Sequence, residues 1–499
     1  MSHEKSATYF GNKGYTIYKE NLEVEEQELI RKELTVSPYV PKNSPHQPTA
    51  FPVYRESKKK MYLPRFYGYK NYGDPEEVRV SEGKKINLKF SGSLRPKQVP
   101  VVEKYMEHIK TSGGGLLALH TGFGKTCLGL NIISRINLKT LIIVHKEFLL
   151  RQWIERIEQF LPDARVGRIQ AQVIDVEDKD IVICMLQSLS MKEYPQELFN
   201  EYGFTIVDEA HHISSEVFSR ALFKIVSKYM LGLSATVKRK DGLTYVIKMF
   251  LGEVVCKIER KGEDKVTVKG INYISEDEEF NEVAYDWRGR VKYSTMIKKI
   301  CEFTDRTEFI LKVLKDIVDR DTENKAQIMV LAHNKSVLKY IHDAIKDRNY
   351  SSVGYYVGGM KEKDLKISEG KKVIIATYAM AEEGLDIKTL TTLLMATPRV
   401  DVTQAVGRIL RMKHDNTEVY DILDQHALFQ RHWKKRRAFY KKQKFKILTT
   451  SNMYYLDDKW DTVFDPEKNI KKGKKGKLKQ TSLSTMSTDP LLIGKCLIE

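Results

Sequence analysis

The chain has 499 residues, with 84 lysines and arginines against 66 aspartates and glutamates, and a formal net charge of +18 at pH 7. This length is too great for one hydrophobic core, and the positive charge favours nucleic acid as a partner, although a merely lysine-rich protein would have the same balance. No segment suits a membrane span or a secretory signal, and the five cysteines form no C-x-x-C pair, so we expect an intracellular, non-secreted chain with no membrane partner, disulfide framework or zinc site.

Residues 1–85 are rich in tyrosine and proline, with prolines at positions 38, 41, 45, 48 and 52. These prolines oppose a helix and predict an extended strap. The aromatic side chains would pack the strap onto a neighbouring domain, which is the commoner arrangement, or stack on bases. We interpret the segment as an N-terminal extension.

Two later regions alternate short apolar segments with amphipathic ones. In the first, residues 86–262, we expect strands at 113–119, 140–145, 180–185, 204–209 and 229–235, with helices at 126–136 and 146–161. In the second, residues 301–427, we expect strands at 326–333, 352–358, 372–378 and 391–397. Such alternation predicts parallel sheets covered by helices on both faces, so the expected fold class is α/β with two lobes in tandem.

The remaining segments are polar or basic. Residues 263–300 are irregular and are interpreted as a connector or small insertion. Residues 428–499 are interpreted as a basic tail, partly disordered from about residue 467, where "KKGKKGKLK" would be solubilising or resemble a nuclear-import signal. Phe429, Trp433 and Tyr440 would share one helical stripe, which we expect to pack on the second lobe while the lysines around it meet phosphate.

A glycine-containing loop joins the expected strand 113–119 to the expected helix 126–136. A usual phosphate loop has glycine where Leu119 stands, so a simple turn before a helix is the alternative. As a phosphate loop, its amides would face the phosphates of ATP, Lys125 would reach the β- and γ-phosphates, and the Thr126 hydroxyl would bind Mg²⁺. The predicted ATP-binding loop comprises Leu119, His120, Thr121, Gly122, Phe123, Gly124, Lys125 and Thr126.

The sequence "DEAH" begins at the end of the expected strand 204–209. Asp208 would hold Mg²⁺ and Glu209 would orient and deprotonate the attacking water, since carboxylates at this edge of a parallel sheet lie beside a phosphate loop. A chance occurrence on a surface loop is the alternative. In the "SAT" that follows the strand at 229–235, Ser234 and Thr236 would couple these carboxylates to the rest of the lobe.

The second region carries further candidates. Arg408 and Arg411 are three residues apart and would share one helical face, suited to charge on a transferring γ-phosphoryl group. A solvated basic face is the alternative, but Gly407 argues against it because glycine weakens a helix unless close approach requires it. The other candidates are Gly384 and Asp386 at the nucleotide ribose, Thr377 at a nucleic-acid phosphate, and Gln98 at an adenine edge.

In this order the motifs resemble those of superfamily 2 helicases and translocases, over roughly residues 90–425. The phrases "LRPKQ", "GFGKT", "LGLSATVKRKDG" and "FLGEVVCKI" are similar to the XPB branch of double-stranded DNA translocases. "YLPRFYGYKNYG", "IIVHKEFLLRQWIERIEQFLPDARVGRI" and "ATYAMAEEGLDI" resemble the XPB-like helicases of large nucleocytoplasmic DNA viruses, a group that includes the poxvirus transcript-release helicase.

The resemblance implies two RecA-like lobes with ATP and Mg²⁺ between them, and an ATP hydrolase that drives translocation or unwinding of double-stranded DNA. It adds Gln404 to the catalytic set of Lys125, Glu209, Arg408 and Arg411. It further implies a role in viral transcription, with viral RNA polymerase or transcription factors as partners, in the host cytoplasm and in the virion. The implied nucleic-acid contacts are His145, Lys146, Gln187, Ser188, His333 and Thr377.

Three other functions stay open. An RNA helicase would share every ATP motif, and the same motor serves DNA repair and recombination. A non-catalytic nucleic-acid-binding component of a virion or transcription complex would be expected to have damaged motifs, whereas Lys125, Asp208, Glu209 and Arg408 are all present.

Overall fold

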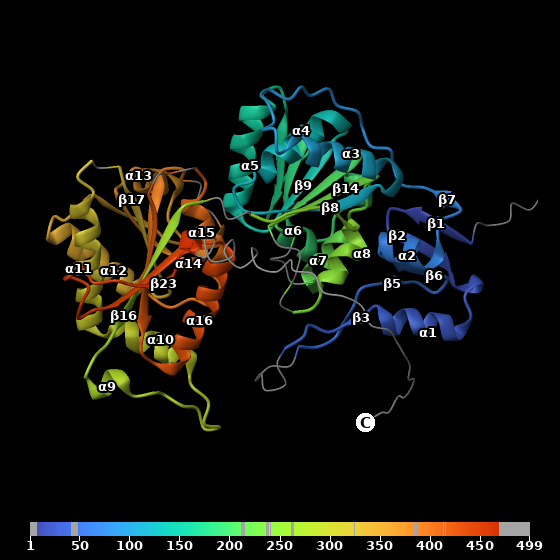
Figure 1. The fold of residues 1–499 in the computed structure, drawn as a ribbon. Coiled ribbons are helices and arrows are strands. Elements are labelled where there is room, and N and C mark those ends of the chain that lie inside the picture. The colour runs from blue at the N-terminus through green and yellow to red at the C-terminus, as the bar shows by residue number, and fades with distance from the viewer. Residues whose placement is uncertain are drawn as a thin grey trace, which may run out of the picture. The chain divides into compact units, whose positions relative to one another are not determined.

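The computed structural model of the chain describes residues 7–40, 48–210, 215–235, 239, 241–260, 264–323, 325–383, 387–412, 414 and 416–468. Contacts divide the chain into two units (Figure 1). The first contains residues 1–261, 378–388 and 404–412, and the second contains residues 262–377, 389–403 and 413–499. Each unit holds a large, mainly parallel sheet with helices, so the predicted α/β fold with two RecA-like lobes is confirmed.

The large sheet of the first unit has the strand order β11-β10-β12-β9-β13-β14-β8-β15, and all its pairs are parallel except β10 with β11. Helices α3, α4 and α5 cover one face and α6, α7 and α8 the other (Figure 1). Its strands are β8 (Gly114–Leu119), β9 (Thr140–Val144), β10 (Val166–Gln170), β11 (Val173–Asp175), β12 (Ile181–Met185), β13 (Phe204–Asp208), β14 (Tyr229–Ser234) and β15 (Val254–Ile258). Its helices are α3 (Val99–Ser112), α4 (Lys125–Ile136), α5 (Glu147–Phe160), α6 (Leu186–Met191), η2 (Gln196–Phe199), α7 (Ser215–Leu222) and α8 (Thr244–Leu251).

Burial on both faces explains why these strands read as continuous apolar runs. In β9, Leu141 and Ile143 pack with α6, α7 and α8, while Ile142 and Val144 pack with α3, α4 and α5. Successive side chains of a strand point to opposite faces, so both faces need apolar residues. The five strands and two helices predicted in this region are all present, with ends within one or two residues of the prediction.

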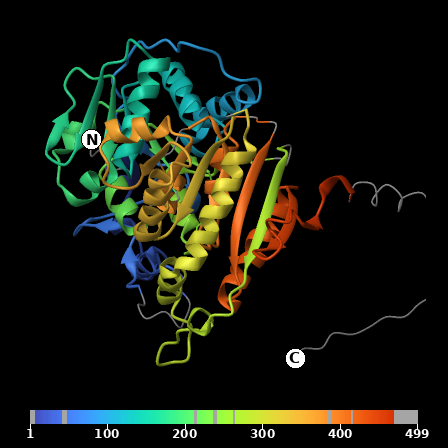
Figure 2. The same cartoon turned by 90° about the vertical axis from the view of Figure 1, so that its left-hand side faces the viewer.

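The sheet of the second unit has the order β18-β19-β17-β20-β21-β16-β22-β23, and only β22 and β23 pair antiparallel. Helices α11 and α12 cover one face and α16 the other (Figure 2). Its strands are β16 (Val266–Tyr273), β17 (Gln327–Ala332), β18 (Val353–Tyr356), β19 (Val373–Thr377), β20 (Leu390–Met395), β21 (Thr417–Asp424), β22 (Lys446–Ser451) and β23 (Asp461–Phe464). The helices of this part of the chain are α9 (Glu278–Asn281), α10 (Tyr293–Glu302), α11 (Thr304–Arg320), α12 (Lys335–Asp347), α13 (Glu362–Glu369), α14 (Tyr378–Glu383), α15 (Thr403–Ile409) and α16 (Ala427–Lys442).

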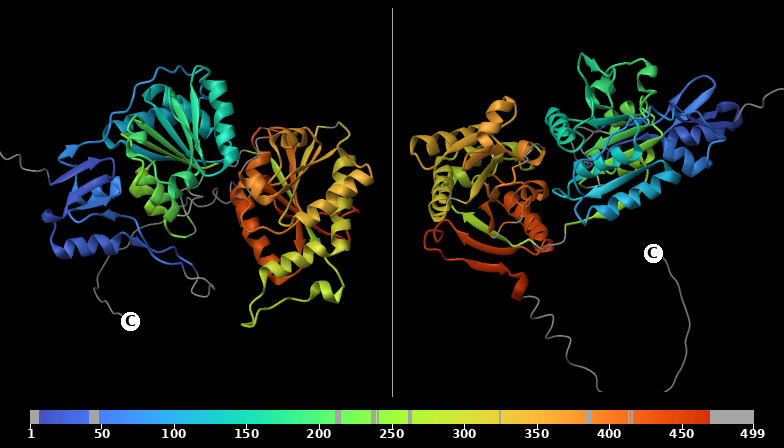
Figure 3. Two further views of the ribbon diagram at one scale, coloured as in Figure 1. Left: turned by 180° about the vertical axis from the view of Figure 1, so that it is seen from behind. Right: turned by 90° about the horizontal axis from the view of Figure 1, so that it is seen from above.

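Two predicted segment boundaries are wrong. Residues 263–300 are not a connector, because β16 lies inside the second sheet between β21 and β22. Charged residues on both sides of β16 mask its strand pattern in the sequence, although Val266, Val268 and Ile271 are buried. Residues 428–464 are not a tail, because β22 and β23 extend the second sheet and α16 packs on it (Figure 3).

Helix α16 combines a basic surface with a buried side. The predicted stripe of Phe429, Trp433 and Tyr440 is buried, which confirms that it packs on the second lobe. Arg436 is also buried, and its guanidinium donates to both carboxylate oxygens of Asp421 in β21, at 2.7 and 3.0 Å. One basic residue of the segment interpreted as a basic tail is therefore part of the core.

The N-terminal segment is a small α/β module more than a strap. Its sheet has the order β5-β6-β2-β1-β7, and a separate pair joins β3 to β4. Around the described prolines, residues 37–40 and 48–50 lack regular structure, whereas Pro52 lies in a strand. Its elements are β1 (Thr8–Gly11), β2 (Gly14–Tyr18), η1 (Lys19–Asn21), α1 (Val24–Glu33), β3 (Thr35–Val36), β4 (Phe51–Pro52), β5 (Arg55–Glu56), β6 (Lys60–Leu63), α2 (Arg65–Tyr72) and β7 (Glu77–Val78).

Among the described residues, no helix has both the length and the apolar character needed to cross a membrane.

Candidate active site

The loop after β8 has the shape of a phosphate loop in spite of its unusual first residue. Leu119 is the last residue of β8 and is fully buried, so the position that usually holds glycine belongs to the strand here. Gly122 and Gly124 have φ angles of 83° and 92°, which turn the chain into α4. Between them, Phe123 is 5% exposed and anchors the loop in the core below.

Gln98 and Arg95 hold this loop from the N-terminal end of α3. The Gln98 Nε2 amide donates to the Phe123 carbonyl at 2.8 Å, and the Arg95 backbone N–H donates to Gln98 Oε1 at 2.8 Å. A Cβ on Gly124 would lie 2.5 Å from Gln98 Nε2, so this contact requires glycine. In the structure the Gln98 amide braces the loop backbone, and its predicted reading of an adenine edge stays a prediction.

Asp208 ends β13 next to α4 and is 5% exposed. Trp153 Nε1 of α5 donates to its Oδ2 at 2.9 Å, and the Glu209 backbone N–H donates to its Oδ1 at 2.9 Å. Burial and the neighbouring charge of Glu209 raise the pKa of Asp208 to about 6. No sequence pattern indicates this role for Trp153, since a tryptophan in an amphipathic helix ordinarily indicates core packing alone.

Glu209 lies directly beyond the strand in the left-handed region, with a φ of 48°. Its Oε1 pairs with Lys125 Nζ at 2.5 Å, and the two side chains are 19% and 12% exposed. The lysine and the carboxylate therefore neutralise each other.

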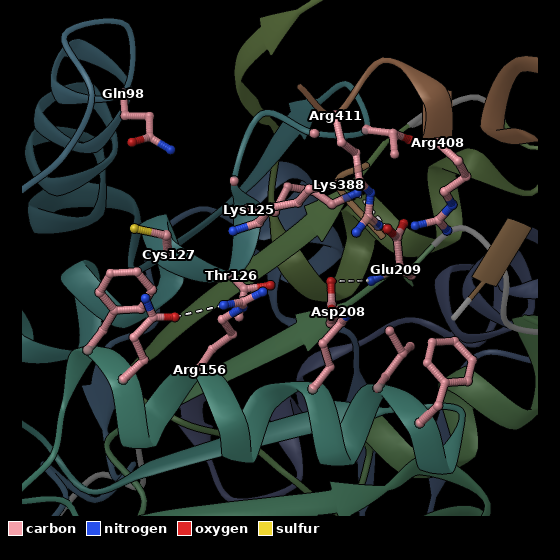
Figure 4. Close-up of a pocket in the computed structure, with 18 of the residues that line it drawn as sticks. Gln98, Lys125, Thr126, Cys127, Arg156, Asp208, Glu209, Lys388, Arg408 and Arg411 are labelled. Carbon is pink, nitrogen blue, oxygen red and sulfur yellow. Dashed lines mark hydrogen bonds and ion pairs between the residues drawn. The ribbon is translucent and has the colours of Figure 1, made fainter. Parts of the chain in front are cut away.

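These groups line one cavity of about 440 Å³ (Figure 4). All five residues of the predicted catalytic set lie in its wall, as do the predicted metal ligands Thr126 and Asp208. From the predicted ATP-binding set, Gln98, Thr121, Gly122 and Gly124 are also there, while Leu119 and Phe123 are buried below and His120 begins the loop. The cavity wall includes Gln98, Thr121, Gly122, Gly124, Lys125, Thr126, Cys127, His145, Asp208, Glu209, Lys388, Gln404, Arg408 and Arg411.

The two arginines reach the cavity differently from the prediction. Helix α15 ends at Ile409, so Arg411 lies beyond it and does not share a helical face with Arg408. Both side chains nevertheless point toward Glu209 in Figure 4. A Cβ on Gly407 would lie 3.3 Å from Thr121 Cβ, so the close approach that this glycine suggested is present.

Sequence reasoning missed the wall contributed by α5. This helix presents an aromatic and polar side to the cavity, and its Arg156 donates to Gln159 Oε1 at 2.7 Å. A sequence signal for this wall exists, because the helix begins just after a strand end and carries glutamines and an arginine on its polar face. The additional wall residues are Ser93, Arg95, Phe148, Leu149, Gln152, Arg156, Gln159 and Phe160.

The predicted nucleic-acid contacts come from both units. His145 was expected to contact nucleic acid, and it lies in the cavity wall, because it follows β9 at the same edge of the sheet as the phosphate loop. Gln187 donates to the His145 carbonyl at 2.8 Å, and the hydroxyl of Ser188, which is 8% exposed, accepts the Ala171 N–H at 3.0 Å. Lys146 is the N-cap residue of α5.

In the second unit, His333 follows β17 and Thr377 ends β19. His333 Nδ1 is 2.8 Å from Thr397 Oγ1, and burial lowers the pKa of His333 to about 4, so its ring is neutral at physiological pH. A contact from His333 to phosphate would therefore be a hydrogen bond without a full charge. Of the coupling pair, Ser234 ends β14 and is 2% exposed. Thr236, Gly384 and Asp386 lie outside the described residues.

The residues around Asp208 suit Mg²⁺. The ion prefers hard oxygen ligands, and the Thr126 hydroxyl and the Asp208 carboxylate both face the cavity. A buried carboxylate whose pKa is raised to about 6 is stabilised in its charged form by a nearby cation. Trp153 and the Glu209 amide use one lone pair on each oxygen, and a carboxylate has further acceptor positions.

Comparison with known proteins agrees with this geometry. The family described as "Type III restriction enzyme, res subunit" matches residues 91–239, which include the phosphate loop and both carboxylates. A protein of Acanthamoeba polyphaga mimivirus, provisionally named ATP-dependent RNA helicase L396, is 32% identical over 459 residues, covering 89% of this chain and 86% of its own length. The chain belongs to the superfamily 2 helicases.

Two further relatives of this helicase also come from large DNA viruses. Helicase 161L of Invertebrate iridescent virus 6, also a provisional name, is 26% identical and covers 72% of this chain and 83% of its own length. The provisionally named ATP-dependent RNA helicase QP509L of African swine fever virus (isolate Pig/Kenya/KEN-50/1950) is 25% identical, covering 68% and 70%. The family identifies the helicase as an ATP-dependent enzyme that acts on nucleic acid.

Proposed function

We propose that this helicase is an ATP-driven motor that translocates along double-stranded DNA during viral transcription. The observation that carries the motor is the meeting of Lys125, Asp208, Glu209 and two arginines at one cavity. The duplex substrate is supported by the likeness of "LGLSATVKRKDG" and "FLGEVVCKI" to the XPB branch of DNA translocases. A role in elongation, termination or transcript release would place the protein beside viral RNA polymerase, in the host cytoplasm and in the virion.

The Lys125–Glu209 ion pair would link phosphate binding to the release of the base. The β- and γ-phosphates of ATP would compete for the Lys125 ammonium, and the amides at the N-terminus of α4 would bind the same phosphates. Glu209, once released, would orient the attacking water and accept its proton. Glu209 therefore becomes an effective base only when the substrate is present.

The remaining groups act on the charge of the transferring phosphoryl group. Arg408 and Arg411 would stabilise the charge that develops on its oxygens, and Gln404 would help to position the attacking water. Mg²⁺ held by Thr126 and Asp208 would neutralise charge on the phosphates. Trp153 keeps the Asp208 carboxylate oriented and ionised through its indole N–H.

An RNA helicase is the second candidate. The specific observation in its favour is that the mimivirus and African swine fever virus relatives are both named RNA helicases. The ATP motifs do not discriminate between the two substrates, because they contact only nucleotide.

A triplex-displacement assay separates the two. Movement along duplex DNA displaces a third strand, so the wild-type protein is expected to release it with ATP, and Glu209→Gln, which removes the base, is not. Unwinding of an RNA duplex without triplex displacement would replace the first proposal by the second. Release of a transcript from a stalled viral elongation complex, dependent on ATP and on Glu209, tests the role in transcription, and its absence would remove that role.

A further inference from the structure

The N-terminal sheet, blue in Figures 1 and 3, has two chemically different faces. Residues directly opposite each other in antiparallel strands point to the same face. On one face the side chains are buried against α1 and α2, and these are Phe10, Tyr15, Ile17, Met61 and Leu63. On the other face the register places Tyr9, Tyr18 and Tyr62. These three tyrosines are half-buried and lie outside the apolar clusters formed by the described residues.

The three tyrosine rings lie along the sheet. Thr16, which stands opposite both Tyr9 and Tyr62, is fully buried although it belongs to this open face. The rings around it therefore cover it. A Cβ on Gly11 would lie 3.0 Å from a ring carbon of Tyr9, so glycine allows that ring to approach the strand. The Tyr9 and Tyr18 ring centroids are 6.1 Å apart.

Three cations lie over these rings. The Arg79 guanidinium is 4.0 Å from the centroid of Tyr9, and the Lys13 ammonium is 5.2 Å from that of Tyr62. Lys60 lies 5.0 Å from the Tyr9 centroid and 4.6 Å from the Tyr18 centroid, and it donates to the Tyr9 hydroxyl at 3.1 Å.

One of these cations is paired with an acid: Arg79 pairs with Glu77 at 2.5 Å. We call Tyr9, Tyr18, Tyr62, Lys13, Lys60 and Arg79 the tyrosine face. Its own members carry three cations, of which one is paired with Glu77, so these side chains give the face a positive charge.

We infer that the tyrosine face is a second nucleic-acid site of this helicase, one that binds a single strand. Bases stack on tyrosine rings and on guanidinium planes, and the ammonium groups of Lys13 and Lys60 would leave the rings to meet the phosphates. A single strand fits better than a duplex because only unpaired bases expose their ring faces. An acidic or neutral protein surface would match the charge but would not need flat rings spaced along a sheet. The inference rests on the proposed function for the presence of nucleic acid, but it concerns residues outside the ATP cavity.

The test compares variants of the full chain for binding of a fluorescently labelled oligothymidine without nucleotide. Tyr9→Ala combined with Tyr62→Ala is expected to weaken binding at least tenfold, since each lost stack weakens it by about fivefold or more. Tyr9→Phe combined with Tyr62→Phe keeps the rings and is expected to stay within about threefold of wild type. Tyr245→Ala combined with Tyr454→Ala, which alters two tyrosines exposed elsewhere, is the matched control.

Two readouts separate this inference from the motor. ATP hydrolysis at saturating duplex DNA is expected to stay at the wild-type rate in the alanine pair, and its melting temperature shows whether it folds. Unchanged oligothymidine affinity in the folded alanine pair would overturn the inference. A face that docked another protein would give this same unchanged affinity. Equal weakening in the phenylalanine pair would also overturn it, because stacking would not be the cause. Failure of the motor would instead appear in the wild type, as hydrolysis that no nucleic acid stimulates.

Discussion

Trp153→Phe is expected to shift the pH dependence of ATP hydrolysis by acting on Asp208. The exchange removes the indole N–H that donates to Asp208 Oδ2 and keeps an aromatic ring in the core. That hydrogen bond stabilises the charged carboxylate, so its loss raises the pKa of a group that burial has already raised to about 6. Asp208 must be ionised to hold Mg²⁺, and a higher pKa therefore moves the acid limb of the activity profile toward higher pH.

The size of the shift follows from the strength of the bond. A hydrogen bond to a charged group contributes about 1.5–3 kcal/mol, and 1.36 kcal/mol corresponds to one pKa unit, so the shift is about one to two units. Near pH 7 the wild-type Asp208 is about 90% ionised and the variant about half ionised or less. The loss should be largest at low Mg²⁺, because saturating Mg²⁺ selects the ionised form.

The assay is kcat/KM for MgATP between about pH 5 and 9, since this ratio reports ionisations of the free enzyme. Trp433→Phe, the same exchange at a buried tryptophan of α16, is the control and should leave the acid limb in place. Thermal melting shows whether the smaller ring has destabilised the fold. An acid limb that stays at the wild-type pH in folded Trp153→Phe would refute the proposed link between the indole and Asp208.

Three further exchanges test the loop, the α15 contact and the second core. Gly124→Ala forces a side chain into a φ of 92°, at a cost of about 1–2 kcal/mol, and should weaken ATP binding at least tenfold by calorimetry; binding within twofold of wild type would contradict it. Gly407→Ala would place a Cβ against Thr121 and should lower the rate of hydrolysis about tenfold. The melting temperature should stay equal or rise, because alanine favours a helix, and an unchanged rate would count against the contact. Arg436→Met leaves Asp421 buried without its cation and should lower the free energy of unfolding in urea by about 3–5 kcal/mol, most of it regained by adding Asp421→Asn, whereas a solvated α16 would show no loss.

The strands that position the site could be predicted because a strand buried on both faces of a sheet requires a nearly continuous run of apolar residues. Lys125 follows the loop after β8, Asp208 ends β13 and Glu209 comes next, so their meeting at one sheet edge was expected from topology. The pattern fails for β16, whose apolar residues are separated by polar ones and flanked by charged segments. It also fails for Arg436, because composition alone does not distinguish a cation paired in the core from one in water.

Contacts made by side chains from distant elements left no trace in the sequence. Gln98 belongs to a motif that predicted adenine recognition. In the structure its amide also holds the loop backbone, and only folding of the loop brings the two partners together. The bond from Trp153 to Asp208 joins residues 55 apart in the chain. In the N-terminal module, tyrosines alternate with other residues, which places their rings on the two faces of the sheet. Which face is open depends on the register of three strands, and the sequence alone does not specify that register.

The most direct test of the central claim is ATP hydrolysis by the purified full chain, alone and with duplex DNA, single-stranded DNA or RNA. Lys125→Ala removes the ammonium that pairs with Glu209, and Lys104→Ala, at an exposed lysine of α3, is the matched control. We predict hydrolysis that duplex DNA stimulates, that Lys104→Ala retains and that Lys125→Ala abolishes. Hydrolysis that persists in Lys125→Ala, or that no polymer stimulates, would contradict the assignment of this cavity as the site of a nucleic-acid motor.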